Sequence, residues 1–272
     1  MLILGGAAVN AQTPVIAAGG VLNGASFDKS GVPVSPGSLV SIFGTNLSAA
    51  TASALSVPIS TSLSSVSVTF NNVPAPLAFV SSDQINAQVP WDILPIIPPG
   101  TNGVTQIPVV VTRNGVPSAP VNVSVGAAAP GIFAYPGGQA VAYGNSDGAI
   151  AANGTPGLPT SHPAKIGDPT TLVILATGLG AVDTTVKNGD VPSVITSSTL
   201  VKPTVLIGNV PAQVVFSGLV GRDASGTAFG FVGVYQINVI IAAGTPTGDK
   251  VPIQIQMNGV TSPNTTTIAV SQ

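Results

Sequence analysis

The stretch Leu39–Leu47, LVSIFGTNL, has a counterpart further along the chain in Leu172–Leu179, LVILATGL. Three more pairs of matching stretches follow in the same order: Asn72-Val73-Pro74-Ala75 with Asn209-Val210-Pro211-Ala212, Gln84-Ile85-Asn86 with Gln236-Ile237-Asn238, and Asn114-Gly115-Val116 with Asn258-Gly259-Val260. Four matches in one order indicate a duplicated unit, with copies near 36–126 and 168–271. The spacing between partners varies, so insertions separate the copies, the largest of them at Gly218–Gly230.

The residue pattern within each copy is that of β-strands. Val66, Val68 and Phe70 alternate with Ser67 and Thr69, which is the period of a half-buried strand. Each copy holds about seven short runs of this kind in roughly 100 residues, as immunoglobulin-like sandwiches do. Two Asn-Gly pairs predict hairpins with type I′ turns, at Asn114-Gly115 and Asn258-Gly259.

We therefore predict an all-β fold: two tandem immunoglobulin-like β-sandwiches from an internal duplication, joined by a Gly/Ala/Pro-rich connecting segment. The expected boundaries are 1–11 for a signal peptide, 12–35 for an N-terminal extended segment with the first strand, 36–126 for the first sandwich, 127–167 for the linker, and 168–272 for the second sandwich. Within the linker we expect a small hairpin built from Gly131–Phe133 and Gln139–Tyr143.

Composition excludes several classes of function. Only 6% of the 272 residues are charged, against about a quarter in average proteins. The formal net charge is −2 and no basic cluster occurs, which argues against nucleic-acid binding. The chain has no cysteine, so disulfides, thiol catalysis and Cys-based zinc sites are excluded.

The N-terminus predicts export. Residues Met1–Ala11 are mostly apolar and end in Val9-Asn10-Ala11, with small side chains where signal peptidase requires them, although no basic residue precedes the apolar part. No other stretch approaches the roughly 20 apolar residues that span a bilayer as a helix. We expect an extracellular protein, secreted or at the cell surface, with no transmembrane segment.

Residues for conventional catalysis are scarce. His162 is the only histidine, no Gly-x-Ser-x-Gly motif occurs, and all nine acidic residues are aspartates in scattered, turn-like contexts. The run Asn145-Ser146-Asp147-Gly148 resembles a calcium loop but lacks its further acidic ligands. We predict no catalytic residues, no bound cofactor and no metal site, and hence a protein that is not an enzyme.

The repeated amides and the few aromatic residues have structural interpretations. Gln84 and Asn86 recur as Gln236 and Asn238, and we expect these amides to tie strands to loops through backbone hydrogen bonds. Trp91 and Tyr235 adjoin the repeated motifs, where we expect them to pack in the core or at the domain junction. Exposure of these rings would instead favour an adhesion or carbohydrate-binding module with extracellular glycans as partners.

A short apolar segment near the N-terminus suggests self-association. Pro14, Val15, Ile16, Ala17 and Ala18 are uncharged and have no counterpart in the second copy. Such a strand could add to the sheet of a neighbouring subunit, or it could pair within its own domain. Two further uncharged runs are capable of forming edge strands, at Ile253–Met257 and Pro263–Val270. Our leading hypothesis is a structural subunit that binds copies of itself, forming a fibre, sheath or surface layer.

Six stretches carry a resemblance to a known family: Asn23–Phe27, Pro36–Leu47, Gln84–Trp91, Ala129–Phe133, Ala176–Gly180 and Tyr235–Val239. Together, over Val21–Val270, they resemble a C-terminal domain family of secreted proteins from Solibacter-type acidobacteria. The resemblance implies secretion and a β-sandwich, with no established activity and no catalytic residues to carry over. The family's domain usually follows other domains, whereas here it fills nearly the whole sequence, which favours self-assembly, adhesion or display.

Overall fold

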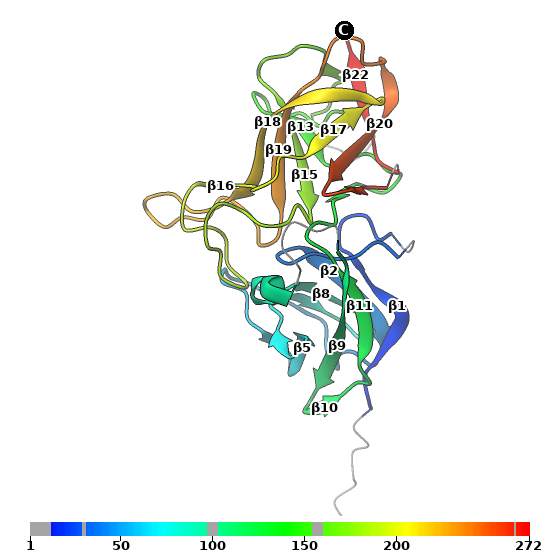
Figure 1. Cartoon of the computed structure of the whole chain (residues 1–272), viewed down its shortest axis with the longest axis vertical. Coiled ribbons are helices and arrows are strands. Elements are labelled where there is room, and N and C mark those ends of the chain that lie inside the picture. Colours follow the sequence, from blue (N-terminus) through cyan, green and yellow to red (C-terminus); the bar gives the residue numbers. More distant parts are fainter. Residues whose placement is uncertain (1–11, 29–30, 97–102, 154–159, 264) are drawn as a thin grey trace, which may run out of the picture.

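The computed structural model describes residues 12–28, 31–96, 103–153, 160–263 and 265–272. The predicted signal peptide at 1–11 lies outside them. The described chain is almost entirely β-strand and loop, with one short 3₁₀ helix, η1 (Trp91–Ile96). Two β-rich lobes follow one another along the longest axis of the molecule, the first half of the chain below and the second above (Figure 1).

The first lobe is a sandwich of two antiparallel sheets. One sheet has five strands in the order β1 (Val15–Asn23), β2 (Leu39–Thr45), β8 (Gln84–Gln88), β7 (Leu77–Val80), β3 (Ala52–Ser53). The other has six: β10 (Val116–Pro117), β9 (Thr105–Arg113), β5 (Val66–Phe70) and β4 (Ser62–Leu63) in order, with β11 (Val121–Val125) on β9 and β6 (Val73–Pro74) on β5. Aliphatic side chains from alternate positions fill the space between them, as the pattern at β5 predicted.

The second lobe is one continuous eleven-stranded sheet that folds around its own core. Its main path is β12 (Gly131–Ile132), β15 (Leu172–Thr177), β19 (Tyr235–Ile240), β18 (Val210–Val220), β17 (Thr204–Ile207), β20 (Gly248–Met257), β22 (Thr267–Ser271), β14 (Ala164–Lys165). Three short strands branch from this path: β13 (Ala142–Gly144) on β15, β16 (Thr196–Ser198) on β18, and β21 (Val260–Thr261) on β20. The all-β, Ig-like fold class predicted from the sequence is confirmed.

The internal duplication is visible in the strand pairing. In the first lobe β2 pairs with β8 so that Ile42 faces Ile85, and in the second lobe β15 pairs with β19 so that Ile174 faces Ile237. The two Asn-Gly turns also correspond, because both residues of each pair have positive φ as a type I′ turn requires. They join β9 to β10 and β20 to β21. The predicted hairpin turns are thus confirmed.

Residues 127–167 contribute more to the second lobe than the expected connecting segment would. Both β12 and β13 pair with β15, and β14 pairs with β22. Many alanines of this segment are small enough to enter the core beside β15, and Ala128, Ala140, Ala142 and Ala151 are buried there. The expected small hairpin is present in short form: Ala134 bridges Ala140, the Val141 N–H donates to the Phe133 carbonyl oxygen (2.7 Å), and the Tyr135 N–H donates to the Gln139 carbonyl oxygen (2.8 Å).

The uncharged runs that we expected to form unpaired edge strands do not all lie at sheet edges. The run Ile253–Met257 belongs to β20, which is paired on both sides, with β17 on one and β21 and β22 on the other. Its interpretation as an edge strand was wrong, because its neighbours in sequence fold back onto it. Where edges do occur they are mostly two or three residues long, as in β3, β4, β12 and β14, and β1 carries a bulge between Ile16 and Val21.

Gly37 illustrates how closely the ring of Trp91 is packed near the junction of the lobes. Gly37 has φ +77°, and a Cβ atom there would overlap the indole ring of Trp91. Gly115 has nearly the same φ, +79°, and a Cβ atom there would meet no other atom within 4 Å. Gly115 is therefore a matched control for Gly37.

We expect Gly115→Ala to lower the free energy of unfolding by about 1 to 2 kcal/mol, the cost of the left-handed backbone alone. Gly37→Ala should cost about 1 to 3 kcal/mol more, because Trp91 must also move. Chemical denaturation measures both values, and Trp91 fluorescence should shift in the folded state of Gly37→Ala only, since it is the single tryptophan. Equal losses in the two variants would contradict the packing argument.

Candidate functional site

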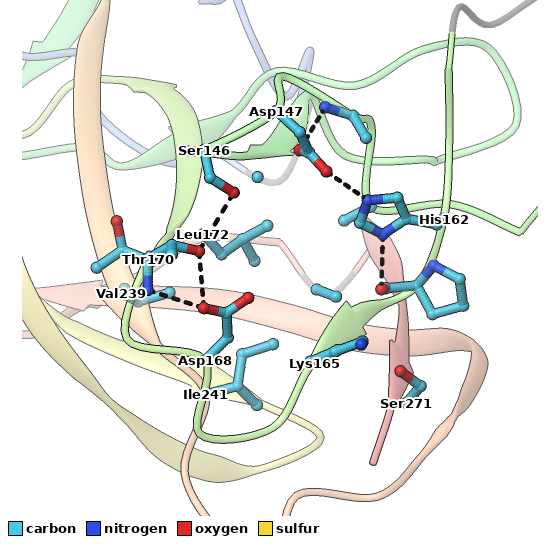
Figure 2. A pocket seen from close by; sticks show the side chains of 16 residues that line it. Ser146, Asp147, His162, Lys165, Asp168, Thr170, Leu172, Val239, Ile241 and Ser271 are labelled. Carbon is cyan, nitrogen blue, oxygen red and sulfur yellow. Dashed lines mark hydrogen bonds and ion pairs between the residues drawn. The ribbon is translucent and has the colours of Figure 1, made fainter.

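A cleft of about 390 Å³ with a polar rim lies on the second lobe. Its rim comes from the loop after β13, which carries Ser146 and Asp147, and from the segment through β14, which carries His162 and Lys165. Side chains of Leu172, Val239 and Ile241 form an apolar wall, and the residues around Asp168 close the other side (Figure 2). The structure thus brings His162 together with two aspartates, although the sequence indicated only scattered loop residues.

His162 uses both of its ring nitrogens within this cleft. Nε2 lies 2.7 Å from the Asp147 carboxylate oxygen Oδ2, and Nδ1 lies 3.0 Å from the Pro163 carbonyl oxygen (Figure 2). Both partners accept hydrogen bonds, so the ring satisfies both only as an imidazolium. The bond to Asp147 accordingly raises the pKa of His162 and lowers the pKa of Asp147. In this arrangement both ring nitrogens carry protons, so neither has a lone pair free to accept another.

The second carboxylate of the cleft is also held in its charged form. Asp168 Oδ1 accepts hydrogen bonds from the Thr170 hydroxyl (2.7 Å) and the Thr170 backbone N–H (2.8 Å), which lower the pKa of Asp168. Hydrolysis by paired carboxylates needs one acid whose pKa is raised, and both aspartates here are shifted the other way. Within the described residues, no three His, Cys, Asp or Glu side chains lie together as a metal site requires.

The ion pair at this cleft makes stability depend on pH. The folded-state pKa of His162 lies above its ordinary value of 6.5, so its contribution is complete below pH 6.5 and declines as pH rises through the raised pKa. The pKa of Asp147 lies below 3.8, so its contribution is lost only as pH falls through that lowered pKa. Lys165 and Asp168 also act on the pair, Lys165 opposing the charge on His162.

We expect His162→Gln to lower the Tm relative to the wild type between pH 4 and 6.5, by a difference that shrinks above pH 6.5. Differential scanning calorimetry across this range measures the difference. Asp147→Asn should flatten the same pH dependence, because it removes the partner. A Tm difference that grows with rising pH would contradict the assigned protonation.

The structure places the repeated amides on corresponding strands of the two lobes. Gln84 Nε2 donates to Asn86 Oδ1 and Gln236 Nε2 donates to Asn238 Oδ1, each at 2.8 Å. We expected bonds to loop backbone, whereas the amides bond to each other along one strand face, since residues i and i+2 project from the same side. The identical geometry in both lobes favours a structural role for the four residues.

The two aromatic residues beside these motifs are buried. Trp91 belongs to η1 of the first lobe but packs against the core of the second lobe. Tyr235 is fully buried, donates its hydroxyl to the Gly180 carbonyl oxygen, and has a raised pKa because of that burial. Neither ring is available to stack on a sugar.

Hydrogen bonds from both lobes fix the junction around Trp91. The buried Thr177 hydroxyl accepts from the Leu39 N–H (2.9 Å) and donates to the Gly233 carbonyl oxygen (2.7 Å). The buried Gln88 side chain accepts from the Gly189 N–H (2.7 Å). Asn188 accepts from the Trp91 N–H (2.7 Å). These bonds cross between segments far apart in sequence and hold the two lobes in one arrangement.

The predicted strand-addition segment consists of Pro14, directly before β1, and the first four residues of β1. Val15 pairs with Thr45 of β2 and Ile16 with Gly44, so the segment pairs within its own domain. Ile16 is buried in the first core, while Ala17 and Ala18 fall at the bulge. The side chain of Pro14 is also buried.

Comparison with known proteins bears on the first lobe. Residues 25–125 match the family model of the IPT/TIG domain. An IPT/TIG domain is present here. TIG domains are non-catalytic Ig-like folds, in agreement with the two packed sheets around β2 and β5. The Solibacter-type family resemblance stays a prediction beside this TIG domain.

Other comparisons are weaker than the TIG match. No curated protein matches the sequence. Among solved structures, the plexin A4 full extracellular region aligns at 9% identity and a TM-score of 0.26, over 99% of this chain but only 19% of the plexin chain. The C-terminal domain of the Streptococcus agalactiae AgI/II polypeptide BspA aligns at 11% identity and a TM-score of 0.18, over 93% of this chain and 98% of that domain.

Proposed function

We propose that this chain is a non-enzymatic extracellular structural protein that associates with copies of itself into a fibre, sheath or surface layer. The observation that carries the proposal is the exposure of large apolar side chains on a surface that is almost without charge. Secretion is part of the same proposal, supported by the predicted signal peptide. No helix in the described ranges has the length and apolar character needed to cross a membrane.

The exposed apolar side chains are numerous and concentrated in the second half. Among the described residues, eleven large hydrophobic side chains are exposed: Val15, Phe27, Leu55, Val104, Val194, Ile195, Leu200, Val201, Val215, Phe229 and Phe231. Scattered single exposures are normal, but groups of them on a soluble protein mark surfaces that bind other macromolecules. Seven of the eleven lie between residues 194 and 231.

Electrostatic repulsion between copies is weak. The whole chain has seven basic and nine acidic residues. Among the described residues, two ion pairs are formed, His162–Asp147 and Arg222–Asp190, which neutralise part of this charge. Net charge is the usual means of keeping proteins apart in solution, and here it is nearly absent.

Side-chain surfaces support association better than strand addition does. The outer edge of β1 is interrupted by its bulge, and bulged or very short edges disfavour pairing with another chain.

The cleft at His162 offers no free base and no carboxyl with a raised pKa, which supports a non-enzymatic role.

We expect the purified mature protein to associate as concentration rises, because burial of apolar surface drives the process. Analytical ultracentrifugation and negative-stain microscopy across a concentration series measure this. The association should survive 1 M NaCl, since salt screens charges but does not weaken apolar contacts. A monomer at every concentration that also binds to a glycan array would instead establish the adhesion-module alternative.

A further inference from the structure

We infer that the face formed by the β18–β19 hairpin and the loop carrying Leu55 is the contact through which a second copy of this chain docks. The inference rests on the proposed function and assigns it a surface. The hairpin occupies the Gly218–Gly230 insertion that distinguishes the second sequence copy from the first. It projects sideways beyond β16, close to the level where the two lobes meet (Figure 1).

An apolar groove of about 600 Å³ lies at this face, between the lobes. Leu55, Val57 and Ile59 line it from the first lobe, and Phe231 and Val232 line it from the second. Leu55 is 98% exposed and Phe231 is 70% exposed. Two large apolar side chains thus face one hollow with little protein to cover them.

The apolar surface continues from the groove onto the hairpin. The Phe229 N–H donates to the Gly221 carbonyl oxygen (3.0 Å), and the Gly221 N–H donates to the Ile195 carbonyl oxygen (2.9 Å). These bonds place the three backbone segments side by side. Phe229 is 60% exposed and Ile195 is 50% exposed, with Val194 next to it. Groove and hairpin together form one face, which we call the junction face.

The hairpin is built rigidly enough to hold its phenylalanines in solvent. Asp223 Oδ1 accepts hydrogen bonds from the N–H groups of Ser225 and Thr227, both at 2.9 Å. Arg222 donates to the Asp190 carboxylate (2.6 Å) and to the Gly226 carbonyl oxygen (3.2 Å). The loop therefore loses little conformational entropy when a partner binds.

Glycines allow the close backbone approach beneath this hairpin. A Cβ atom on Gly221 would overlap the carbonyl oxygens of Pro192 and Val194, and one on Gly230 would overlap that of Val220. Both glycines have φ outside the left-handed region, so they serve close packing, not an unusual turn. These two residues hold the base of the hairpin tightly while Phe229 and Phe231 stay uncovered.

The junction face supplies a large part of the area that contact with a second copy needs. Its five large apolar side chains present roughly 500 Å² together, at up to 150–250 Å² for a fully covered aromatic residue. A stable interface covers about 800 Å² on each partner, of which these five side chains would supply more than half. The face also has both a hollow and a projecting hairpin, the elements that a self-complementary contact requires.

Charge on the junction face favours an identical copy over a charged partner. Its cation, Arg222, is already bound to Asp190, and Asp223 is engaged by its own turn. Two such faces do not repel each other. A polyanion or a strongly basic protein finds no unpaired opposite charge among these residues.

The test compares the self-association of three variants by sedimentation equilibrium. Leu55→Asp and Phe231→Ser should each raise the Kd of self-association at least tenfold, because each removes apolar contact and the first also buries a charge. Phe27→Ser is the matched control, since Phe27 is an exposed phenylalanine that contacts Phe43 of β2 and not the groove. Its Kd should stay at the wild-type value. Leu55 is almost fully exposed, so Leu55→Asp should keep the wild-type Tm.

Cross-linking identifies the occupant directly, because the chain has no cysteine of its own. Leu55→Cys and Phe229→Cys proteins, mixed and joined by a short bis-maleimide, should give covalent dimers, whereas Phe27→Cys should not. Association that neither Leu55→Asp nor Phe231→Ser weakens would overturn the junction face and leave the proposed function standing. A wild-type protein that stays monomeric at every concentration would overturn both.

Discussion

Burial of aliphatic side chains from alternate strand positions is the constraint on which the whole structure depends. With few charges and no disulfides, the chain relies on this burial to pack the sheet faces together, while backbone hydrogen bonds join the strands within each sheet. Most of the buried alternate positions in β5, β9, β19 and β20 are valine or isoleucine, and the residues between them are not buried. The β-branched side chain suits this pleated, half-buried surface, so the same residues specify both the strands and the core.

Both lobes pack equivalent strand pairs in this way, whereas the junction between the lobes depends on other contacts. Ile42 and Ile85 in the first lobe have the same pairing as Ile174 and Ile237 in the second. At the junction, the buried hydroxyl of Thr177 and the ring of Trp91 connect one lobe to the other. The hydrogen bonds of the buried Thr177 hydroxyl restrict the junction to one arrangement, which apolar contact alone does not do.

Much of the fold could be predicted from the sequence, because periodicity and turn chemistry are local signals. Alternation predicted β5, and the two Asn-Gly pairs predicted the hairpins of β9 and β20. The alanine-rich segment was harder, since alanine favours no particular strand pattern and Ala142 is buried only because β15 lies beside it. The partners of Ile253–Met257 likewise depend on long-range pairing, which no local window contains.

Most features of the candidate sites could not be predicted from the sequence. His162 and Asp147 are fifteen residues apart, and Ile150 brings their segments together by bridging both Tyr143 and Ser161. The exposure of Phe229 and Phe231 could not be predicted from residue type, since phenylalanine is more often buried. One signal was present: the Gly218–Gly230 insertion breaks the repeat, and residues that a duplicated partner lacks are not needed for the common fold.

The form of the sheet edges determines how their protection against strand addition depends on salt. Many proteins carry lysine on their edge strands to prevent pairing with another chain, and salt screens the charge on which this protection depends. In this protein the shortness of most edge strands and the bulge in β1 protect the edges instead. Because this protection comes from the shape of the strands, we expect ionic strength to have little effect on how well the edges resist addition of another strand.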